Sequence, residues 1–537
     1  MDLVLLGGNV LTMDARDTRA EAVAVDNGHI AAVGATAEIA PCVGPETTVV
    51  PLVGRTLLPG FIDPHNHFSL TTFAPVSVDC SMPPQRHLTP ILEAIATAAK
   101  AAPRGRWLRG WGFRPREVRD NRAMTRWALD EVAPENPVCI MDGSCHACYV
   151  NSAALALAGI DRHTPDPPHG RILREPNGEP NGILWERAMD RVHALSLRAY
   201  LDYYSGDTVA DLVQTNGRRH LACGITSLGD ALVTPEAAAM YQLAEARHQL
   251  PFVLHQMLGG VHFYAPPEEA ATGTIDDGHV SDRLRGRTVK LFMDPVFPRS
   301  AQLCFHASGQ VERLGEPYYT QEEVNRLVLR AHQRGLQVAI HCLGTWAIEQ
   351  ALTAFEHAHR ASPRAEPRFR IEHFTYPTGA QIRRAQSLGV VACVQPPFVF
   401  TGGQRREQTA REMGGDVRSL PFRTMLDAGM VVAATSDSPC APVEPLLGLY
   451  AMVTRQTQGG GPPAGPDEAV TPLDGLRMYT RTAAYAMGRE REVGSLEPGK
   501  RADLVVLSHD PTAVDPASLR EVRVEQTYVE GQCLYQR

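Results

Sequence analysis

The chain has 537 residues, more than one ordinary hydrophobic core supports, so we expect a large central domain with smaller attachments. A composition with 44% hydrophobic and 21% charged residues is typical of globular proteins and excludes a largely disordered chain. The net charge of -8 is modest and no dense Lys/Arg run is present, which argues against nucleic acid or an anionic membrane as a partner.

The two ends of the chain share a strand-rich pattern. Residues 1–57 contain short β-rich runs at 3–6, 22–25, 30–33 and 48–52, separated by Gly and Asn turns. Residues 489–537 contain similar runs at 503–507, 522–529 and 532–535. This pattern predicts one small β-sandwich assembled from both termini.

The middle of the chain, residues 58–488, alternates strand-like and helix-length segments, which predicts a parallel α/β architecture. The strand candidates are 60–65, 225–228, 252–256, 288–292, 337–341, 368–373, 390–395 and 431–436. Eight strands are the number that closes a (β/α)8 TIM-like barrel. Residues 75–219, between the first and second strands, are too long for a loop and predict an insertion subdomain over one mouth of the barrel.

The expected location is the cytoplasm. The first 17 residues lack a basic flank and a small-residue cleavage pattern, and no apolar run reaches the length of a membrane span. The 11 cysteines are scattered, which favours reduced, mostly buried thiols. The expected partners are a small-molecule substrate and a second copy of the chain in a homodimer.

The sharpest chemical signal is His65-Asn66-His67 at the end of the first barrel strand. Alternation along a strand puts both imidazoles on one side, where a single metal ion can meet both. The alternative is two polar residues that merely end a strand.

Four more polar residues lie at or near the carboxyl ends of later strands: Lys290, His341, His373 and Asp437. In a (β/α)8 barrel these ends form the active-site face, so the four side chains are expected to converge with the two histidines. Six converging nitrogen and oxygen groups predict a dinuclear metal site. A single buried histidine is more often structural, but four strands sharing the pattern favour the metal site.

Longer motifs carry a resemblance to a known family. They are LLPGFIDPHNHF (57–68), HACYVNSAAL (146–155), GITSLGD (224–230), TVKLFMD (288–294), AIHCLG (339–344), RIEHF (370–374), PFRTMLDAGMVVAATSDSP (421–439) and GSLEPGKRADLVVL (494–507). With these motifs the chain resembles the amidohydrolase superfamily and, within it, the branch of N-substituted formamide deformylase.

The resemblance implies roles for individual residues. It implies that His65, His67 and Asp437 bind the more buried metal and that His341 and His373 bind the second. Lys290 matches a position that is carboxylated in many relatives and bridges both ions. His146 and Asn151 are implied to face the substrate pocket. Asp294 is also assigned to the pocket, although Pro295 stands where the branch has glycine.

Physical chemistry favours the carboxylated lysine, because an ammonium beside two dications is repelled whereas a carbamate is an anion with two oxygens. An unmodified lysine of lowered pKa is the alternative. The predicted cofactor is one or two divalent ions, zinc first, with manganese, cobalt or iron also accepted by such ligands. A metal lowers the pKa of bound water to roughly 7, and Asp437 is predicted to carry the proton to the leaving nitrogen.

The sequence therefore predicts a metal-dependent hydrolase of a small amide-like compound. An N-formyl or N-acyl amine is the first choice of substrate, and a cyclic amide or imide is the second. A metal-dependent decarboxylase on the same scaffold and a non-catalytic binding protein are the rival hypotheses.

Overall fold

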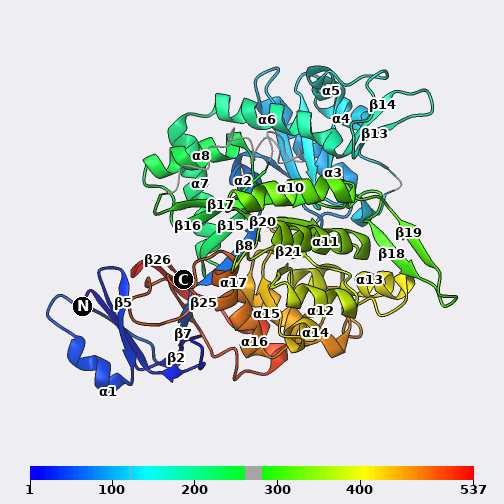
Figure 1. Ribbon diagram of the computed structural model, residues 1–537. Coiled ribbons are helices and arrows are strands. Elements are labelled where there is room, and N and C mark those ends of the chain that lie inside the picture. Colours follow the sequence, from blue (N-terminus) through cyan, green and yellow to red (C-terminus); the bar gives the residue numbers. More distant parts are fainter. Residues whose placement is uncertain (121, 260–280) are drawn as a thin grey trace.

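The computed structural model describes residues 1–120, 122–259 and 281–537. Figure 1 shows a central barrel with its helices, a lobe of sheets at one end where both termini lie, and a second lobe above the barrel. None of the described helices is long and apolar enough to cross a membrane.

The barrel is an eight-stranded sheet in which every neighbouring pair is parallel. Around the sheet the strands are β8 (Phe61–Asn66), β15 (Ile225–Val233), β16 (Val253–Leu258), β17 (Leu284–Phe292), β20 (Gln337–Cys342), β21 (Arg370–His373), β22 (Val391–Val394) and β23 (Val431–Ala434). Beyond β23 the chain returns to β8, where the Asp437 N–H donates to the His65 carbonyl at 2.9 Å. The predicted barrel and its eight strands are confirmed.

Two strands are longer than predicted by at least four residues. The second runs on to Val233, which pairs with Leu258, and the fourth begins at Leu284, which pairs with Leu254. Both extensions form a ladder with β16. Pairing with a neighbouring strand, and not the local pattern alone, therefore sets these ends.

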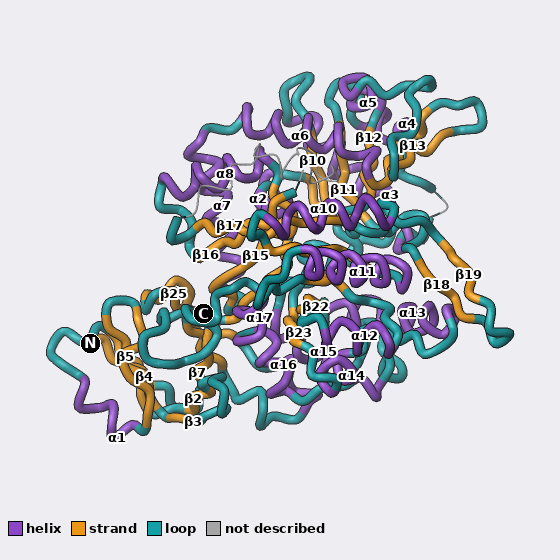
Figure 2. The backbone as a smooth tube through the Cα atoms, in the orientation of Figure 1, coloured by secondary structure: helices purple, strands orange, loops and turns teal. Residues whose placement is uncertain are grey.

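Helices cover the outside of the barrel, and Figure 2 shows them alongside the strands. They include α7 (Gly206–Leu221), α8 (Pro235–Ala246), α10 (Gln321–Gln333), α11 (Thr345–Ala361), α12 (Gly379–Ser387), α13 (Pro397–Met413), α14 (Phe422–Asp427), α15 (Pro445–Thr454), α16 (Pro472–Tyr479) and α17 (Arg481–Ala486). Capping boxes at Thr320 and Thr378 start α10 and α12. In α11 the buried Ile348, Leu352 and Phe355 recur at helical spacing, so this face packs on the sheet.

The terminal lobe consists of two sheets. One has the order β5-β4-β1-β6 and the other the order β26-β25-β24-β7-β2-β3. These strands are β1 (Leu3–Leu6), β2 (Asn9–Leu11), β3 (Arg19–Ala20), β4 (Ala22–Asp26), β5 (His29–Gly34), β6 (Thr48–Pro51), β7 (Thr56–Pro59), β24 (Leu504–Leu507), β25 (Val524–Val529) and β26 (Gln532–Gln536). Leu5 and Val23 of the first sheet share a core with Leu57 and Val506 of the second. The predicted sandwich of both termini is confirmed, while its limits at residues 57 and 489 stay predictions.

The lobe above the barrel is inserted after β8 and is built on a sheet of order β13-β14-β12-β11-β10-β9. The strands are β9 (Val78–Asp79), β10 (Leu108–Phe113), β11 (Val138–Asp142), β12 (Ala147–Val150), β13 (Gly170–Arg174) and β14 (Pro180–Glu186). Helices α3 (Leu88–Ala101), α4 (Arg126–Val132), α5 (Ser152–Ala158) and α6 (Asp190–Tyr203) accompany them. The predicted insertion subdomain is confirmed, and its limits at 75–219 stay predictions.

Candidate metal centre and substrate cavity

All six predicted metal-ligand residues lie at one end of the barrel and line one cavity of about 700 Å³. His65 and His67 come from the end of β8, Lys290 from β17, His341 from β20, His373 from the end of β21 and Asp437 from the loop after β23. Their side chains are almost completely buried. The structure thus brings the six groups to the carboxyl ends of the strands, as the parallel barrel requires.

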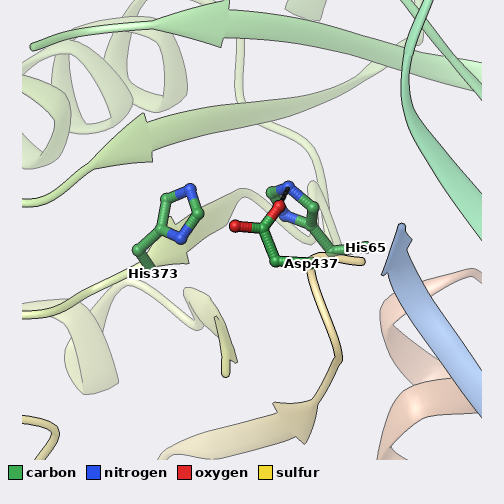
Figure 3. A group of neighbouring side chains, drawn as sticks. All are labelled: His65, His373 and Asp437. Carbon is green, nitrogen blue, oxygen red and sulfur yellow. Dashed lines mark ion pairs between the residues drawn. The ribbon is translucent and has the colours of Figure 1, made fainter. Parts of the chain in front are cut away.

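Asp437 is at the centre of the most compact group. Its Oδ1 lies 3.2 Å from His65 Nε2 and 3.1 Å from His67 Nε2. One ligand atom each from His65, His373 and Asp437 lies within 4.8 Å of the others, as Figure 3 illustrates. The His341 ring adjoins this group, with its centroid 4.3 Å from that of His373. One cation can be bound by three of these groups at once.

Hydrogen bonds fix which nitrogen of two histidines faces the group. His65 Nδ1 lies 2.5 Å from Glu372 Oε2, and His373 Nδ1 lies 2.8 Å from Gln395 Oε1. Because a carboxylate or amide oxygen only accepts, the ring proton sits on Nδ1 and the lone pair on Nε2. Metal-binding histidines are held by such outer partners in the same way.

The charge states also fit a metal. Burial lowers the pKa of His373 to about 3 and holds that of His341 well below its ordinary value. Burial raises the pKa of Asp437, but the contacts with His65 and His67 outweigh it and keep the pKa well below its ordinary value. Neutral imidazoles and a carboxylate are the donor set that zinc and similar divalent ions accept.

Two of these residues adopt a backbone conformation that side chains rarely take. His373 has φ 73° and Asp437 has φ 56°. A non-glycine residue in this region costs on the order of 1–3 kcal/mol, and such residues cluster at functional sites. At both positions the backbone conformation sets how the side chain reaches the cavity.

Lys290 is buried beside the histidines. Its Nζ lies 3.5 Å from His65 Nε2 and 4.9 Å from the centre of the Phe292 ring. Burial, with a contribution from Arg370, lowers the pKa of Lys290 below its ordinary value. The uncharged amine is therefore more accessible here than in water.

The insertion contributes His146 to the cavity. Its Nδ1 lies 2.6 Å from Glu186 Oε2, and its ring centre lies 5.3 Å from that of His341. Glu186 also accepts from the Tyr318 hydroxyl at 2.6 Å and from the N–H groups of residues 296 and 297 at 2.9 Å. Glu186 therefore ties the insertion to the barrel loop beside the site.

Two predicted substrate residues do not line the cavity. Asn151 caps α5, with Oδ1 accepting from the Ala154 and Val138 N–H groups and Nδ2 donating to the Ala133 and Asn136 carbonyls. All its polar atoms are used by the insertion's own backbone. Asn151 therefore has a structural role and is not among the residues that line the described cavity, while its predicted contact with substrate stays a prediction.

Asp294 likewise holds loops together. Its carboxylate accepts from the N–H groups of Leu343 and Gly344 at 2.9 Å and of Ala301 at 3.2 Å. Oδ1 lies 3.7 Å from His341 Nε2, and burial raises the pKa of Asp294 to about 7. Asp294 thus supports the loop beside His341 and is not among the residues that line the described cavity, while its predicted contact with substrate stays a prediction.

Sequence reasoning missed Glu372, Gln395 and Glu186. Alternation places Glu372 and His373 on opposite faces of a strand, but the positive φ of His373 breaks the alternation, and both contact His65. The only local sequence signal for these three residues is that each is an acidic or amide residue at a strand end. The contacts themselves join residues far apart in the chain.

Comparisons with known proteins agree with this geometry. A sequence model described as "Amidohydrolase family" matches residues 48–535. The chain is 40% identical to the N-substituted formamide deformylase of Arthrobacter pascens, covering 100% of this chain and 98% of that protein. It is 29% identical to the putative amidohydrolase YtcJ of Bacillus subtilis, with both chains fully covered.

Solved structures show the same fold. An uncharacterized metal-dependent hydrolase from Pyrococcus horikoshii matches with a TM-score of 0.73 at 22% identity, covering 96% of this chain and 99% of that one. The atrazine chlorohydrolase TrzN from Arthrobacter aurescens, complexed with zinc, matches with a TM-score of 0.56 at 17% identity, covering 99% of this chain and 95% of that one.

Proposed function

The chain belongs to the amidohydrolase family, and from that premise we propose that this metal-dependent C–N hydrolase cleaves a small N-formyl or N-acyl amine. The observation that carries the proposal is the buried group of His65, His373 and Asp437, whose two imidazoles turn Nε2 toward the carboxylate. The relative of 40% identity is named for the deformylation of N-substituted formamides, and this supports the formyl group as first choice.

The residues present fit one or two divalent ions. We assign His65, His67 and Asp437 to one ion, and His341 and His373 to a second. Lys290, carboxylated on Nζ, is proposed to bridge them, and zinc is proposed as the metal because the donors are imidazole and carboxylate. When bound, such an ion makes water acidic enough to lose a proton near neutral pH and polarises a carbonyl.

Asp437 is proposed to move the proton. Its Oδ1 lies 3.2 Å from His65 Nε2 and 3.1 Å from His67 Nε2, and we propose that Oδ2 accepts a proton from the attacking water. Hydrolysis then breaks the C–N bond, the water oxygen stays with the acid, and Oδ2 returns the proton to the leaving nitrogen. His146, held through Nδ1 by Glu186, is proposed to accept a hydrogen bond from the substrate amide N–H through Nε2.

The cavity supports a small substrate with an apolar part. A volume of about 700 Å³ is within the range of small-molecule sites. Trp111, Phe292, Phe297 and Phe398 are among its lining residues. The buried walls around the site also keep bulk water away from the reacting groups.

The test joins metal analysis to an assay of released products. Purified protein should contain one to two divalent ions per chain and should release both amine and acid from N-formyl-2-phenylethylamine or a related amide. Active protein that contains no metal would overturn the metal centre, and release of carbon dioxide without an amine would favour a decarboxylase. A cytoplasmic location and a homodimeric assembly stay predictions from the sequence.

A further inference from the structure

Six of the described arginine side chains, from several parts of the chain, line the substrate cavity, and Arg219 and Arg299 are among them. Arg114 and Arg116 come from the insertion, and Arg405 and Arg406 come from α13 of the barrel. Their convergence is a product of the fold. Four described carboxylates line the same cavity. Glu117 forms an ion pair with Arg86 at 2.5 Å, and Asp142 accepts a hydrogen bond from Ser144. Asp437 lies in the metal centre, and Glu444 immediately precedes α15.

Arg406 is held close to the metal centre. Its Nη1 donates to the Phe398 carbonyl at 2.9 Å, and its guanidinium carbon lies 4.5 Å from the centre of the Phe398 ring. The Phe398 ring also lies parallel to His373, at 9° and 6.3 Å between centroids. Arg406 and a proposed metal ligand therefore adjoin the same aromatic ring.

Arg114 is fixed over the loop that carries Asp437. Its Nη2 donates to the Cys440 carbonyl at 2.8 Å, three residues after Asp437. Gly143 leaves the space that Arg114 occupies, since a Cβ on Gly143 would lie only 2.8 Å from Arg114 Nε. The insertion and the barrel thus present two positioned cations to one cavity.

Among the residues that the structure describes, no ion pair joins a carboxylate to Arg114, Arg405 or Arg406. Their interactions with Asp142, Glu117 and Asp437 act only at longer range. Burial, with help from Arg405 and Arg114, lowers the pKa of Arg406 to about 10, which leaves it charged at neutral pH. Keeping a partly desolvated guanidinium without an anion is unfavourable. An anionic group on a bound ligand would remove that cost.

We propose that the substrate carries a carboxylate, which Arg406 and Arg114 bind with Arg405 nearby, so that the substrate class is an N-formyl or N-acyl amino acid. The fork of an arginine matches the two oxygens of a carboxylate and can bind both. The amide then lies toward His373 and Asp437 while its carboxylate lies toward the arginines. This inference rests on the proposed function and narrows it from neutral amides to anionic ones.

The test compares two substrates that differ only in the carboxylate, N-formylphenylalanine as a racemate and N-formyl-2-phenylethylamine. The protein should show the higher kcat/KM for the anionic substrate. Arg406→Met should lower kcat/KM for the anionic substrate by about 10- to 100-fold, chiefly through KM, as expected when a hydrogen bond to a charged group is lost. The neutral substrate should be hardly affected, and Arg406→Lys should retain part of the preference.

Arg411→Met is the matched control, because Arg411 is an exposed arginine on the same helix and is not among the cavity-lining residues. Arg114→Met provides an independent variant on another part of the fold, with the same expected selectivity. Unfolding temperatures of all variants identify any that fail to fold.

The possible outcomes separate the two proposals. Hydrolysis of the neutral amide with no preference for the anionic one overturns the carboxylate inference and leaves the proposed function standing. An equal loss of kcat/KM for both substrates in Arg406→Met and Arg114→Met also overturns it. The arginines would then bind the acid that both substrates release, or stabilise the fold, and would not recognise a substrate carboxylate. Hydrolysis of no amide at all overturns the proposed function itself.

Discussion

Glu372 Oε2 lies 2.5 Å from His65 Nδ1, and Arg370 Nε donates to the other oxygen of Glu372 at 2.8 Å. All three side chains are buried. Burial raises the pKa of Glu372, but Arg370 and His65 outweigh burial and hold the pKa below its ordinary value. A permanent carboxylate therefore keeps the His65 proton on Nδ1 and its lone pair on Nε2.

Glu372→Gln should weaken metal binding. The amide keeps the shape but loses the charge that orients His65, and outer partners of this kind typically contribute 10- to 100-fold to metal affinity. It also leaves Arg370 without its buried counter-ion, which is strongly destabilising, by about 3–5 kcal/mol. Metal content after dialysis against a competing chelator and the unfolding free energy check this. Unchanged metal affinity would show that Glu372 does not act through His65.

Asp437→Asn should lower kcat by at least about 10²-fold, because the amide keeps the shape but cannot accept the proton that the mechanism assigns to Oδ2. Steady-state kinetics on a formamide substrate measure this. Asp427→Asn is the control, since Asp427 lies exposed on α14. Near-full turnover by Asp437→Asn would contradict the assigned proton transfer even if metal is still bound.

Lys290→Ala should lose the proposed second ion and most of the activity. The missing carbamate is an anionic bridge, and a small acid such as acetate can occupy the vacated space. Metal stoichiometry should fall from two ions toward one, and acetate should restore part of the activity. If the protein binds two ions and stays active without Lys290, the bridging role is wrong.

Glu186→Gln should lower kcat/KM by about 10-fold or more. The carboxylate accepts from His146, Tyr318 and two backbone N–H groups, whereas an amide has a donor where one of its oxygens was. His146 then shifts its proton to Nε2 or loses its orientation. His146→Ala should resemble this variant, and combining the two should add little further loss. Additive losses would mean that Glu186 does not act through His146.

The unfolding free energy should fall as pH drops below about 6.5. Burial lowers the pKa of His255 to about 3, so between pH 6.5 and 3 the unfolded chain binds a proton that the folded chain does not. Stability from this residue is complete above pH 6.5 and declines by about 1.4 kcal/mol per pH unit below it. Denaturant titrations at pH 7.5 and 5.5 should show a smaller decline for His255→Gln. Equal declines would exclude His255 as a cause.

The sequence by itself determined the barrel and the positions of its polar strand ends. Strand runs and their spacing are local, so the eight strands and the six groups from His65 to Asp437 could be placed before any contact was known. The roles of single polar residues were harder to predict from the sequence. Asn151 and Asp294 form their hydrogen bonds with backbone groups of the folded loops, which no residue pattern specifies.

Only the tertiary structure decided what surrounds those six groups. Glu372 contacts His65, which is 307 positions away in the sequence, and Glu186 accepts a hydrogen bond from the Val296 N–H, which is 110 positions away. Arg114 of the insertion and Arg406 of the barrel helix α13 line the same cavity. Local propensity fixes the elements, whereas long-range packing brings their side chains together. The partners of a buried charge therefore follow from the fold, where each must be satisfied.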